Sequence, residues 1–122
     1  MPDDIDGRRQ ELGEFIRAQR SSHRLSLRRL SDVSGISNPY LSQIERGLRK
    51  PSAEVLQRIA RALAVPTEEL YVRAGILESA ADGDLVGHIL RDPTLSDDQK
   101  GALVELYLKY RADGGGEDRA PG

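Results

Sequence analysis

Residues Leu27–Gly47 read LRRLSDVSGISNPYLSQIERG, and this stretch decides how the chain folds. Ser26 is a good N-cap for a first short helix, and Gly35 suits the left-handed backbone that ends one. Ser37 then caps a second helix, in which Pro39 falls in the first turn, where its missing N–H costs little. The pattern predicts two short helices joined by a tight turn, and the second helix has an unusually polar outer face.

Apolar residues at helical spacing predict three further helices around this pair. One runs from about Arg8 to Ser21, one follows the N-cap Ser52, and a short one includes Leu70. The sequence contains no strand-like alternation and no internal repeat. We therefore expect an all-α fold, with one compact domain over residues 8–77.

The two ends of the chain differ in composition from this domain. Residues 1–7 are acidic and are expected to form a flexible N-terminus, while residues 78–95 read as a linker with a short helix. Residues 96–111 begin with the serine and glutamine of a capping box and predict a C-terminal helix. Residues 112–122, rich in glycine, read as a disordered tail.

The C-terminal helix has more apolar surface than one small domain needs. We expect it to pair with a second copy of the chain through Leu103, Leu106, Tyr107 and Tyr110. The alternative is that this helix folds back on the first and fifth helices of its own domain.

Composition excludes several classes of protein and points to one kind of partner. The 122 residues include no cysteine, which excludes disulfides and thiolate metal sites, and no apolar run approaches the ~18 residues of a membrane span. The net charge of −2 hides an uneven distribution, because residues 8–73 carry 13 Lys and Arg against 7 Asp and Glu. A basic domain of this kind favours contact with a polyanion, and we expect the protein in the cytoplasm.

Several motifs occur together in one order: the small Ser31, the turn Gly35, the sequence SNPYLSQIERG, then KPS, and then the apolar spacing of LQRIARALAV. Through them Arg9–Leu77 resembles the phage-repressor-like helix-turn-helix regulators of the Cro/cI or XRE type. The resemblance implies a five-helix lambda-repressor-like DNA-binding domain with a C-terminal helical extension. It also implies a transcriptional regulator that binds double-stranded DNA sequence-specifically, as a homodimer on a pseudo-palindromic site.

The resemblance lays the helix Ser37 to Arg46 in the DNA major groove. The positions that match base-contacting residues of the family are Asn38, Pro39, Tyr40, Ser42 and Gln43. Gln43 is the strongest candidate because glutamine can bond to adenine through two hydrogen bonds. Ordinary surface polarity remains the alternative for Asn38 and Gln43, and core packing for Tyr40.

A second set of residues is expected to contact the DNA backbone, which sets affinity and salt dependence rather than sequence choice. Its members are Ser26, Arg28, Ser37, Arg46, Arg49 and Lys50. Leu27 departs from the family pattern, because many relatives carry a DNA-contacting glutamine at this position. The resemblance also suggests that Glu45 pairs with Arg20 of the first helix, in a structural role.

Nothing in the sequence points to an enzyme. His23 and His88 are far apart and lack metal-ligand spacing, and no nucleophile–base pair or phosphate-cradling glycine loop occurs. We expect no metal and no cofactor. The alternative function is a helix-turn-helix adaptor, or an antitoxin-type regulator, that acts through a partner protein docked on the acidic C-terminal region.

Overall fold

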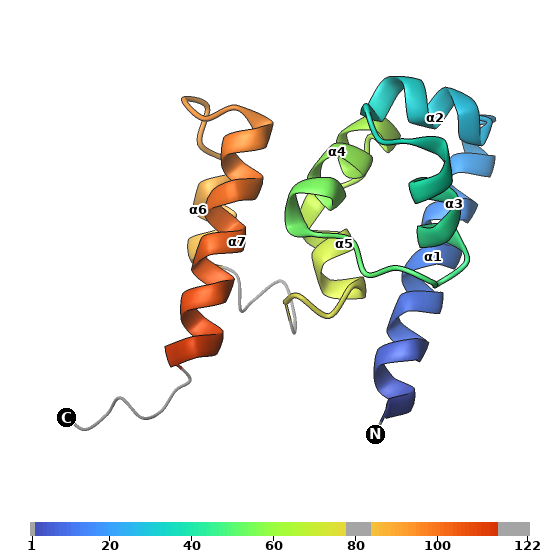
Figure 1. Cartoon of the computed structure of the whole chain (residues 1–122). Helices are drawn as coiled ribbons and strands as arrows, with labels where there is room; N and C mark the ends of the chain where they lie inside the picture. The colour runs from blue at the N-terminus through green and yellow to red at the C-terminus, as the bar shows by residue number, and fades with distance from the viewer. Residues whose placement is uncertain (1, 78–83, 115–122) are drawn as a thin grey trace.

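The described part of the chain is all-helical, which confirms the predicted fold class (Figure 1). The computed structural model describes residues 2–77 and 84–114, and the side chains of residues 7–77 and 85–111. Five helices form the N-terminal domain and two follow it: α1 (Pro2–Ser22), α2 (Leu27–Ser34), α3 (Asn38–Glu45), α4 (Ala53–Leu63), α5 (Thr67–Arg73), α6 (Asp84–Leu90) and α7 (Asp97–Gly114).

Helix α1 begins at Pro2 rather than at about Arg8, where its start was expected, and the flexible N-terminus over residues 1–7 stays a prediction. The physical reason is that a proline and acidic residues are favoured in the first turn of a helix, where they suit its free N–H groups and dipole. The composition that suggested an unstructured end therefore also suits a helix start. Leu12 and Ile16 of α1 are buried in the core.

The pair α2 and α3 has the predicted turn. Gly35 ends α2 with a φ of +75°, a left-handed conformation that glycine adopts without a steric penalty. The hydroxyl of Ser31 donates to the carbonyl oxygen of Ile36 at 2.6 Å, which ties the end of α2 to the segment leading into α3. Leu30, Leu41 and the other inward residues then place both helices on one core.

Helix α4 lies at the centre of the molecule and contacts α2, α5 and α7. Its apolar residues are almost completely buried: Ala53, Leu56, Ile59, Ala60 and Leu63. Tyr71 of α5 is buried against it, and its hydroxyl is 3.3 Å from both the carbonyl oxygen of Ala53 and Oε1 of Gln57. The core of the domain thus depends on α4.

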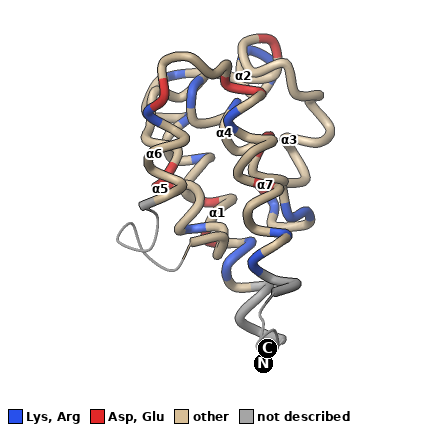
Figure 2. Tube along the Cα trace, turned by 90° about the vertical axis from the view of Figure 1, so that its left-hand side faces the viewer, with Lys and Arg blue, Asp and Glu red and all other residues tan. Residues whose placement is uncertain are grey.

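Helices α6 and α7 lie side by side, and α7 packs along α4 (Figures 1 and 2). The predicted capping box forms, since Gln99 N–H donates to Ser96 Oγ at 3.1 Å and Ser96 N–H donates to Gln99 Oε1 at 2.9 Å. Helix α7 extends beyond the predicted end at Arg111, to Gly114. Residues 78–83 of the linker expected over 78–95, and residues 115–122 of the tail expected over 112–122, lie outside the described residues.

Three kinds of contact hold α7 on α4. Gly101 brings the backbones together, because a Cβ at this position would be 2.7 Å from Glu54 Cα. Glu105 accepts a hydrogen bond from the backbone N–H of Ala53, at the N-terminus of α4. Ion pairs join Arg58 to Asp98 at 3.0 Å and Arg61 to Asp97. One face of α7 therefore does fold back, but onto α4 rather than onto the first and fifth helices.

The other face of α7 remains open in the described structure. Leu103, Leu106 and Tyr110 are 40%, 46% and 64% exposed, respectively. Tyr107, the fourth residue expected at a dimer interface, instead packs partly buried against the chain's own core. The structure thus shows that one face of α7 folds back onto the domain, and pairing with a second copy through the exposed face stays a prediction.

Candidate nucleic-acid interface

Helix α3 has one buried apolar face and one accessible polar face. Leu41 and Ile44 on the inner face are completely buried. Of the residues predicted to contact bases, Asn38 and Pro39 are exposed, whereas Tyr40, Ser42 and Gln43 are partly exposed. A helix with a rigid apolar back and an accessible polar front suits entry into a DNA groove.

The two serines predicted to contact the DNA backbone are the N-caps of α2 and α3. Ser26 Oγ accepts a hydrogen bond from Arg29 N–H at 3.0 Å, and Ser37 Oγ accepts one from Tyr40 N–H at 3.3 Å. Both serines are exposed. Free N–H groups and the positive end of the dipole make such helix ends favourable for a phosphate.

The structure brings together Arg20 of α1 and Glu45 of α3. Arg20 Nε donates to Glu45 Oε2 at 2.7 Å, and a terminal nitrogen of Arg20 donates to Glu45 Oε1 at 3.0 Å. The other terminal nitrogen donates to the carbonyl oxygen of Leu25 at 2.8 Å. Glu45 is buried, so this two-bond pair fixes α3 on α1 and turns its acid away from the exposed surface.

The charge on Glu45 affects the arginine in turn. The pKa of Arg20 lies above its usual value because it donates hydrogen bonds to the Glu45 carboxylate, although partial burial opposes this shift. Arg17, which is largely exposed, lies 3.8 Å from the same carboxylate. Two arginines of α1 thus neutralise the acid at the end of α3.

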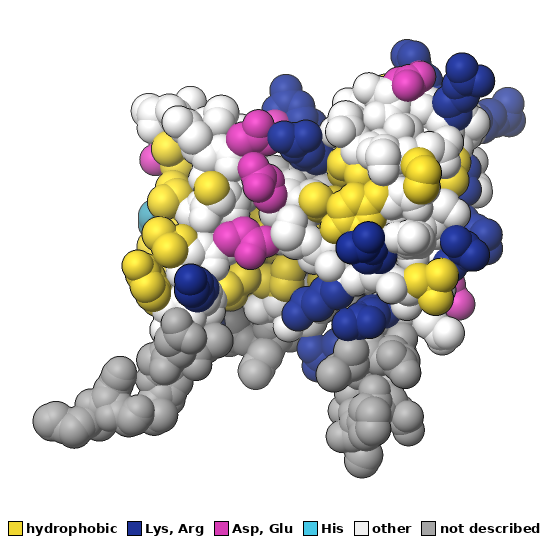
Figure 3. All heavy atoms as spheres, in the orientation of Figure 1, with side chains coloured by type: hydrophobic (Ala, Val, Ile, Leu, Met, Phe, Trp, Pro, Cys, Tyr) yellow, Lys and Arg dark blue, Asp and Glu magenta, His cyan; other side chains and the backbone are white. Residues whose placement is uncertain are grey.

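Exposed cations surround the polar face of α3. Figure 3 shows Lys and Arg side chains gathered over the N-terminal domain, and Asp and Glu side chains near the C-terminal helices. The predicted backbone-contacting cations, Arg28, Arg46, Arg49 and Lys50, are all exposed. Leu27, at the departure from the family pattern, packs partly buried against the core.

Arg49 differs from the other cations in being held by α3. Its Nε donates to Gln43 Oε1 at 2.9 Å, and its guanidinium lies over the Tyr40 ring, 5.1 Å from the ring centroid. From the sequence we expect Arg49 to contact the DNA backbone and Gln43 and Tyr40 to contact bases. The structure joins these three residues in one cluster.

Gly13 of α1 was missed from the sequence. A Cβ at this position would be 2.5 Å from the carbonyl oxygens of both Ile44 and Glu45. The last turn of α3 therefore rests directly on the backbone of α1. A glycine inside a helical pattern is the one sequence signal for such a close approach.

Ser34 was also missed. It is buried, and its Oγ accepts a hydrogen bond from Ile36 N–H at 3.3 Å, within the turn between α2 and α3. The Ser34 hydroxyl thus provides an acceptor for Ile36 N–H, which lies beyond the end of α2 at Gly35. Ser34 lies between the motif residues Ser31 and Gly35, and the sequence carries no signal for its role.

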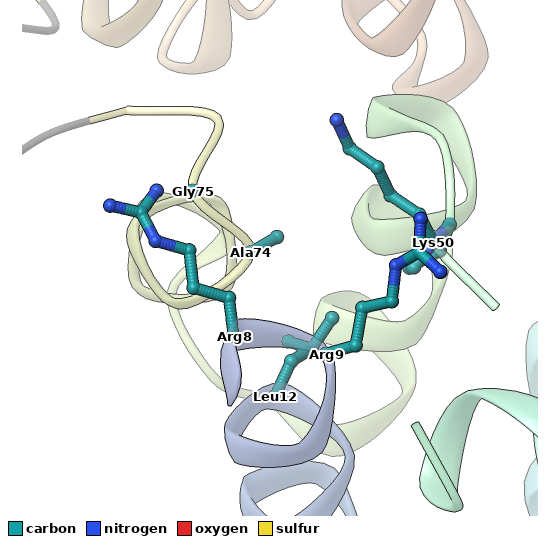
Figure 4. Close-up of a pocket in the computed structure, with 7 residues that line it drawn as sticks. Arg8, Arg9, Leu12, Lys50, Ala74 and Gly75 are labelled. Atoms are coloured by element: carbon teal, nitrogen blue, oxygen red, sulfur yellow. The ribbon is translucent and has the colours of Figure 1, made fainter. Parts of the chain in front are cut away.

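A small basic cavity of about 110 Å³ lies where the start of the domain meets the loop after α3. Arg8, Arg9 and Lys50 line it, together with apolar residues that include Leu12 (Figure 4). Nε of Arg9 is buried and has no hydrogen-bond partner among the described residues. The basic surface around α3 thus extends onto α1, which sequence reasoning confined to the motif could not detect.

The described residues hold no group of three or more His, Asp or Glu side chains that could bind a metal ion. His23 directly follows α1, and its Nδ1 is 2.8 Å from the carbonyl oxygen of Gln19. No helix in residues 2–77 and 84–114 is long and apolar enough to cross a bilayer.

Comparisons with known proteins identify the family. A family model described as "Helix-turn-helix" matches residues 16–70. An HTH-type transcriptional regulator of Mycobacterium tuberculosis is 51% identical over 98 residues, which cover 80% of this chain and 70% of that protein. The transcriptional regulator ClgR of the same species is 40% identical over 67 residues, covering 55% of this chain and 60% of ClgR. The repressor RghR of Bacillus subtilis is 36% identical over 70 residues, covering 57% of this chain and 52% of RghR.

No solved structure matches the chain at a significant level. The family match nevertheless agrees with the two-helix motif that the structure shows around Gly35. The most extensive of the reported matches covers more than two thirds of this chain and of the relative. The chain therefore belongs to the helix-turn-helix transcriptional regulators of the XRE type, and it is a DNA-binding regulator of transcription.

Proposed function

We propose that this regulator binds specific double-stranded DNA sites as a homodimer, with α3 in the major groove. The observation that carries the proposal is the accessible polar face of α3, whose opposite face is buried and whose end is fixed by the Arg20–Glu45 pair. A groove-reading helix must be held rigidly, because the hydrogen bonds to base edges depend on position.

The residues around α3 divide into two proposed roles. Contacts with bases come from the accessible side of α3: Asn38, Pro39, Tyr40, Ser42 and Gln43. Contacts with phosphates come from the helix caps and the exposed cations: Ser26, Arg28, Ser37, Arg46, Arg49 and Lys50. The first set determines sequence preference, and the second determines affinity and its dependence on salt.

The exposed face of α7 supports the homodimer. Leu103, Leu106 and Tyr110 form an apolar surface on one side of a helix whose other side is already packed on α4. A two-fold pair of such helices would bury this surface, and the two α3 helices would then meet half-sites about 34 Å apart, one turn of DNA. This geometry predicts a pseudo-palindromic site.

Selection of bound DNA from a random pool with the full chain tests the proposal, because it yields the preferred sequence and the half-site spacing together. Enrichment of two related half-sites one helical turn apart is the expected result. A salt titration on a random-sequence duplex supplements it, with a steep loss of affinity expected as phosphate contacts are screened. Failure to bind any duplex at low salt would overturn the proposal.

The second candidate is an adaptor or antitoxin-type regulator that acts through a partner protein. The observation that favours this candidate is the exposed apolar side of α7, because a partner protein could cover Leu106 and its neighbours in place of a second copy. A monomer that binds no DNA would support this candidate. For the leading proposal we place the protein in the cytoplasm, at the nucleoid, with no cofactor.

A further inference from the structure

Arg49 is the one predicted backbone-contacting residue whose guanidinium is fixed by base-contacting candidates. Its Nε donates to Gln43 Oε1 at 2.9 Å, and its guanidinium carbon lies over the ring of Tyr40, 5.1 Å from the centroid. Both contacts come from the outer side of α3, although Arg49 itself lies in the loop that follows the helix. An arginine that meets only phosphates needs no such support, because a phosphate accepts a cation from many directions.

The contact with Gln43 uses one particular edge of the guanidinium. Because Nε is occupied, the end of the side chain with Nη1 and Nη2 remains available, and neither atom hydrogen-bonds to another described residue. These two nitrogens form a planar fork of donors. Guanine is the base that presents two acceptors, O6 and N7, to such a fork in the major groove.

The same contact changes what Gln43 can read. Since Nε–H of Arg49 is a donor, the amide of Gln43 must turn its oxygen toward Arg49. The two-bond contact with adenine requires the amide oxygen and the amide NH₂ to face the same base. With its oxygen directed at Arg49, Gln43 keeps its NH₂ group to donate to a neighbouring base, and the adenine preference inferred from its residue type is lost.

We propose that Arg49 reads a guanine in each half-site, and that Gln43 and Tyr40 are positioning residues that orient its guanidinium. This inference rests on the proposed sequence-specific DNA binding. The guanidinium carbon lies over the Tyr40 ring and Nε donates to Gln43, so two contacts from α3 limit the orientations that the guanidinium can take. Base preference at this position is then a property of three residues rather than of α3 alone.

Replacing Arg49 by lysine separates the two possible roles, because lysine keeps the charge that a phosphate needs but lacks the fork that guanine needs. Selection from a random pool should yield a guanine in each half-site with the wild type and no preference at that position with R49K. Affinity for the best wild-type site should fall by roughly tenfold or more in R49K, with little change on a random duplex. Arg111→Lys, the same chemical change at an exposed arginine of α7 with no proposed contact to DNA, is the matched control and should leave the base profile unchanged.

Two further variants test the positioning roles. Gln43→Ala should remove the guanine preference in wild type but should have little further effect in an R49K background, because the two residues act together. Tyr40→Phe keeps the ring and should keep the preference, whereas Tyr40→Leu should weaken it. All these positions are at least partly exposed, and circular dichroism will verify that each variant is folded.

The outcomes are distinguishable from failure of the proposed function. If wild type enriches no sequence, the proposed sequence-specific binding fails. If wild type enriches defined half-sites but R49K retains the same profile, or if the profile has adenine rather than guanine at the Arg49 position, the role of Arg49 is refuted. A uniform loss of affinity across all sequences in R49K would likewise refute base reading.

Discussion

At the scale of single residues, the buried carboxylate of Glu45 carries the strongest prediction for stability. Replacement of Glu45 by Ala leaves Arg20, whose side chain is 17% exposed, without its two hydrogen bonds to the acid. We expect a loss of about 2–4 kcal/mol in the free energy of unfolding. This loss lies toward the lower end of the range for broken buried ion pairs, because the Arg20 side chain is partly exposed to solvent. Urea denaturation followed by circular dichroism measures it.

The exposed pair between Arg73 and Glu69 of α5 provides the control for this prediction. These side chains are 34% and 43% exposed and 2.9 Å apart, with i,i+4 spacing. Glu69→Ala should therefore cost under about 0.5 kcal/mol. Equal losses for the two variants would show that the Arg20–Glu45 pair has no special importance for the fold.

Tyr71 predicts how stability responds to alkaline pH. Burial in the core raises the pKa of its hydroxyl above the usual value near 10, and the negative charge of Glu105 adds to the shift. The unfolded chain thus loses this proton at lower pH than the native chain does. The stabilisation from neutral Tyr71 is complete below pH ~10 and declines as pH rises through the native pKa, by up to about 1.4 kcal/mol per pH unit.

Comparison with Tyr71→Phe isolates this effect from the other ionisable groups. At pH 7 the variant should lose about 1 kcal/mol, because the hydroxyl no longer donates to its acceptors on α4. Above pH 10 the difference between wild type and variant should shrink and then reverse. Thermal unfolding at a series of pH values measures it, and a difference independent of pH would contradict the assignment.

At the scale of helices, the contact of α1 with α3 depends on Gly13. An Ala side chain there would meet the carbonyl oxygens of Ile44 and Glu45, which belong to the backbone and cannot move aside freely. We expect Gly13→Ala to destabilise the protein by about 1–3 kcal/mol and to weaken DNA binding, since α3 is displaced. Thermal unfolding and a binding titration on a selected site measure the two effects.

Gly7 in the same helix is the matched control, because a Cβ there meets no atom within 4 Å. Gly7→Ala should stabilise α1 by up to about 1 kcal/mol through the better helix propensity of alanine. The same chemical change is thus expected to have opposite signs at two positions of one helix. Stabilisation by both substitutions would contradict the close approach of α1 and α3.

At the scale of the whole molecule, the assembly is expected to depend on the open face of α7. Replacing Leu106 by Glu places a charge in the proposed dimer interface without touching the face packed on α4. Sedimentation should find a dimer for the wild type and a monomer for the variant. Leu48→Glu, which changes another exposed leucine, is the control and should leave the mass unchanged.

This substitution is a sharper test than removal of everything after Leu77. Truncation would also remove the contacts of Gly101 and Glu105 with α4 and uncover the core of the domain. A wild-type monomer, or a dimer that persists in Leu106→Glu, would argue against pairing through α7. Retention of thermal stability in Leu106→Glu would verify that α7 remains docked.

Most of the domain architecture was predictable because its signals are local. N-caps at Ser26, Ser37 and Ser52 and the turn at Gly35 each act within a few residues of the chain, so they can be read in order along the sequence. The start of α1 was predicted wrongly because a local signal can fit two different structures. The acidic residues 1–7 suit either a solvated end or the first turn of a helix, and local composition does not separate them.

Other contacts could not be predicted because they join residues that are far apart in the sequence. Gly13 meets α3 across more than thirty residues of sequence, and Glu105 meets α4 across fifty-two. The division of α7 into a docked face and an open face likewise appears only when α4 is beside it. Hydrophobic periodicity predicts that a helix has an apolar side but does not say which neighbour covers it.

The sequence by itself determined the all-α class, the two-helix motif and the polar outer side of α3, because capping, turn geometry and helical periodicity are set by neighbouring residues. Only the tertiary structure decided that Arg49 returns to Gln43 and Tyr40 and that α7 folds onto α4. Such contacts depend on how loops and helices meet in space. The base preference that we propose for Arg49 therefore depends on the folded molecule rather than on the motif alone.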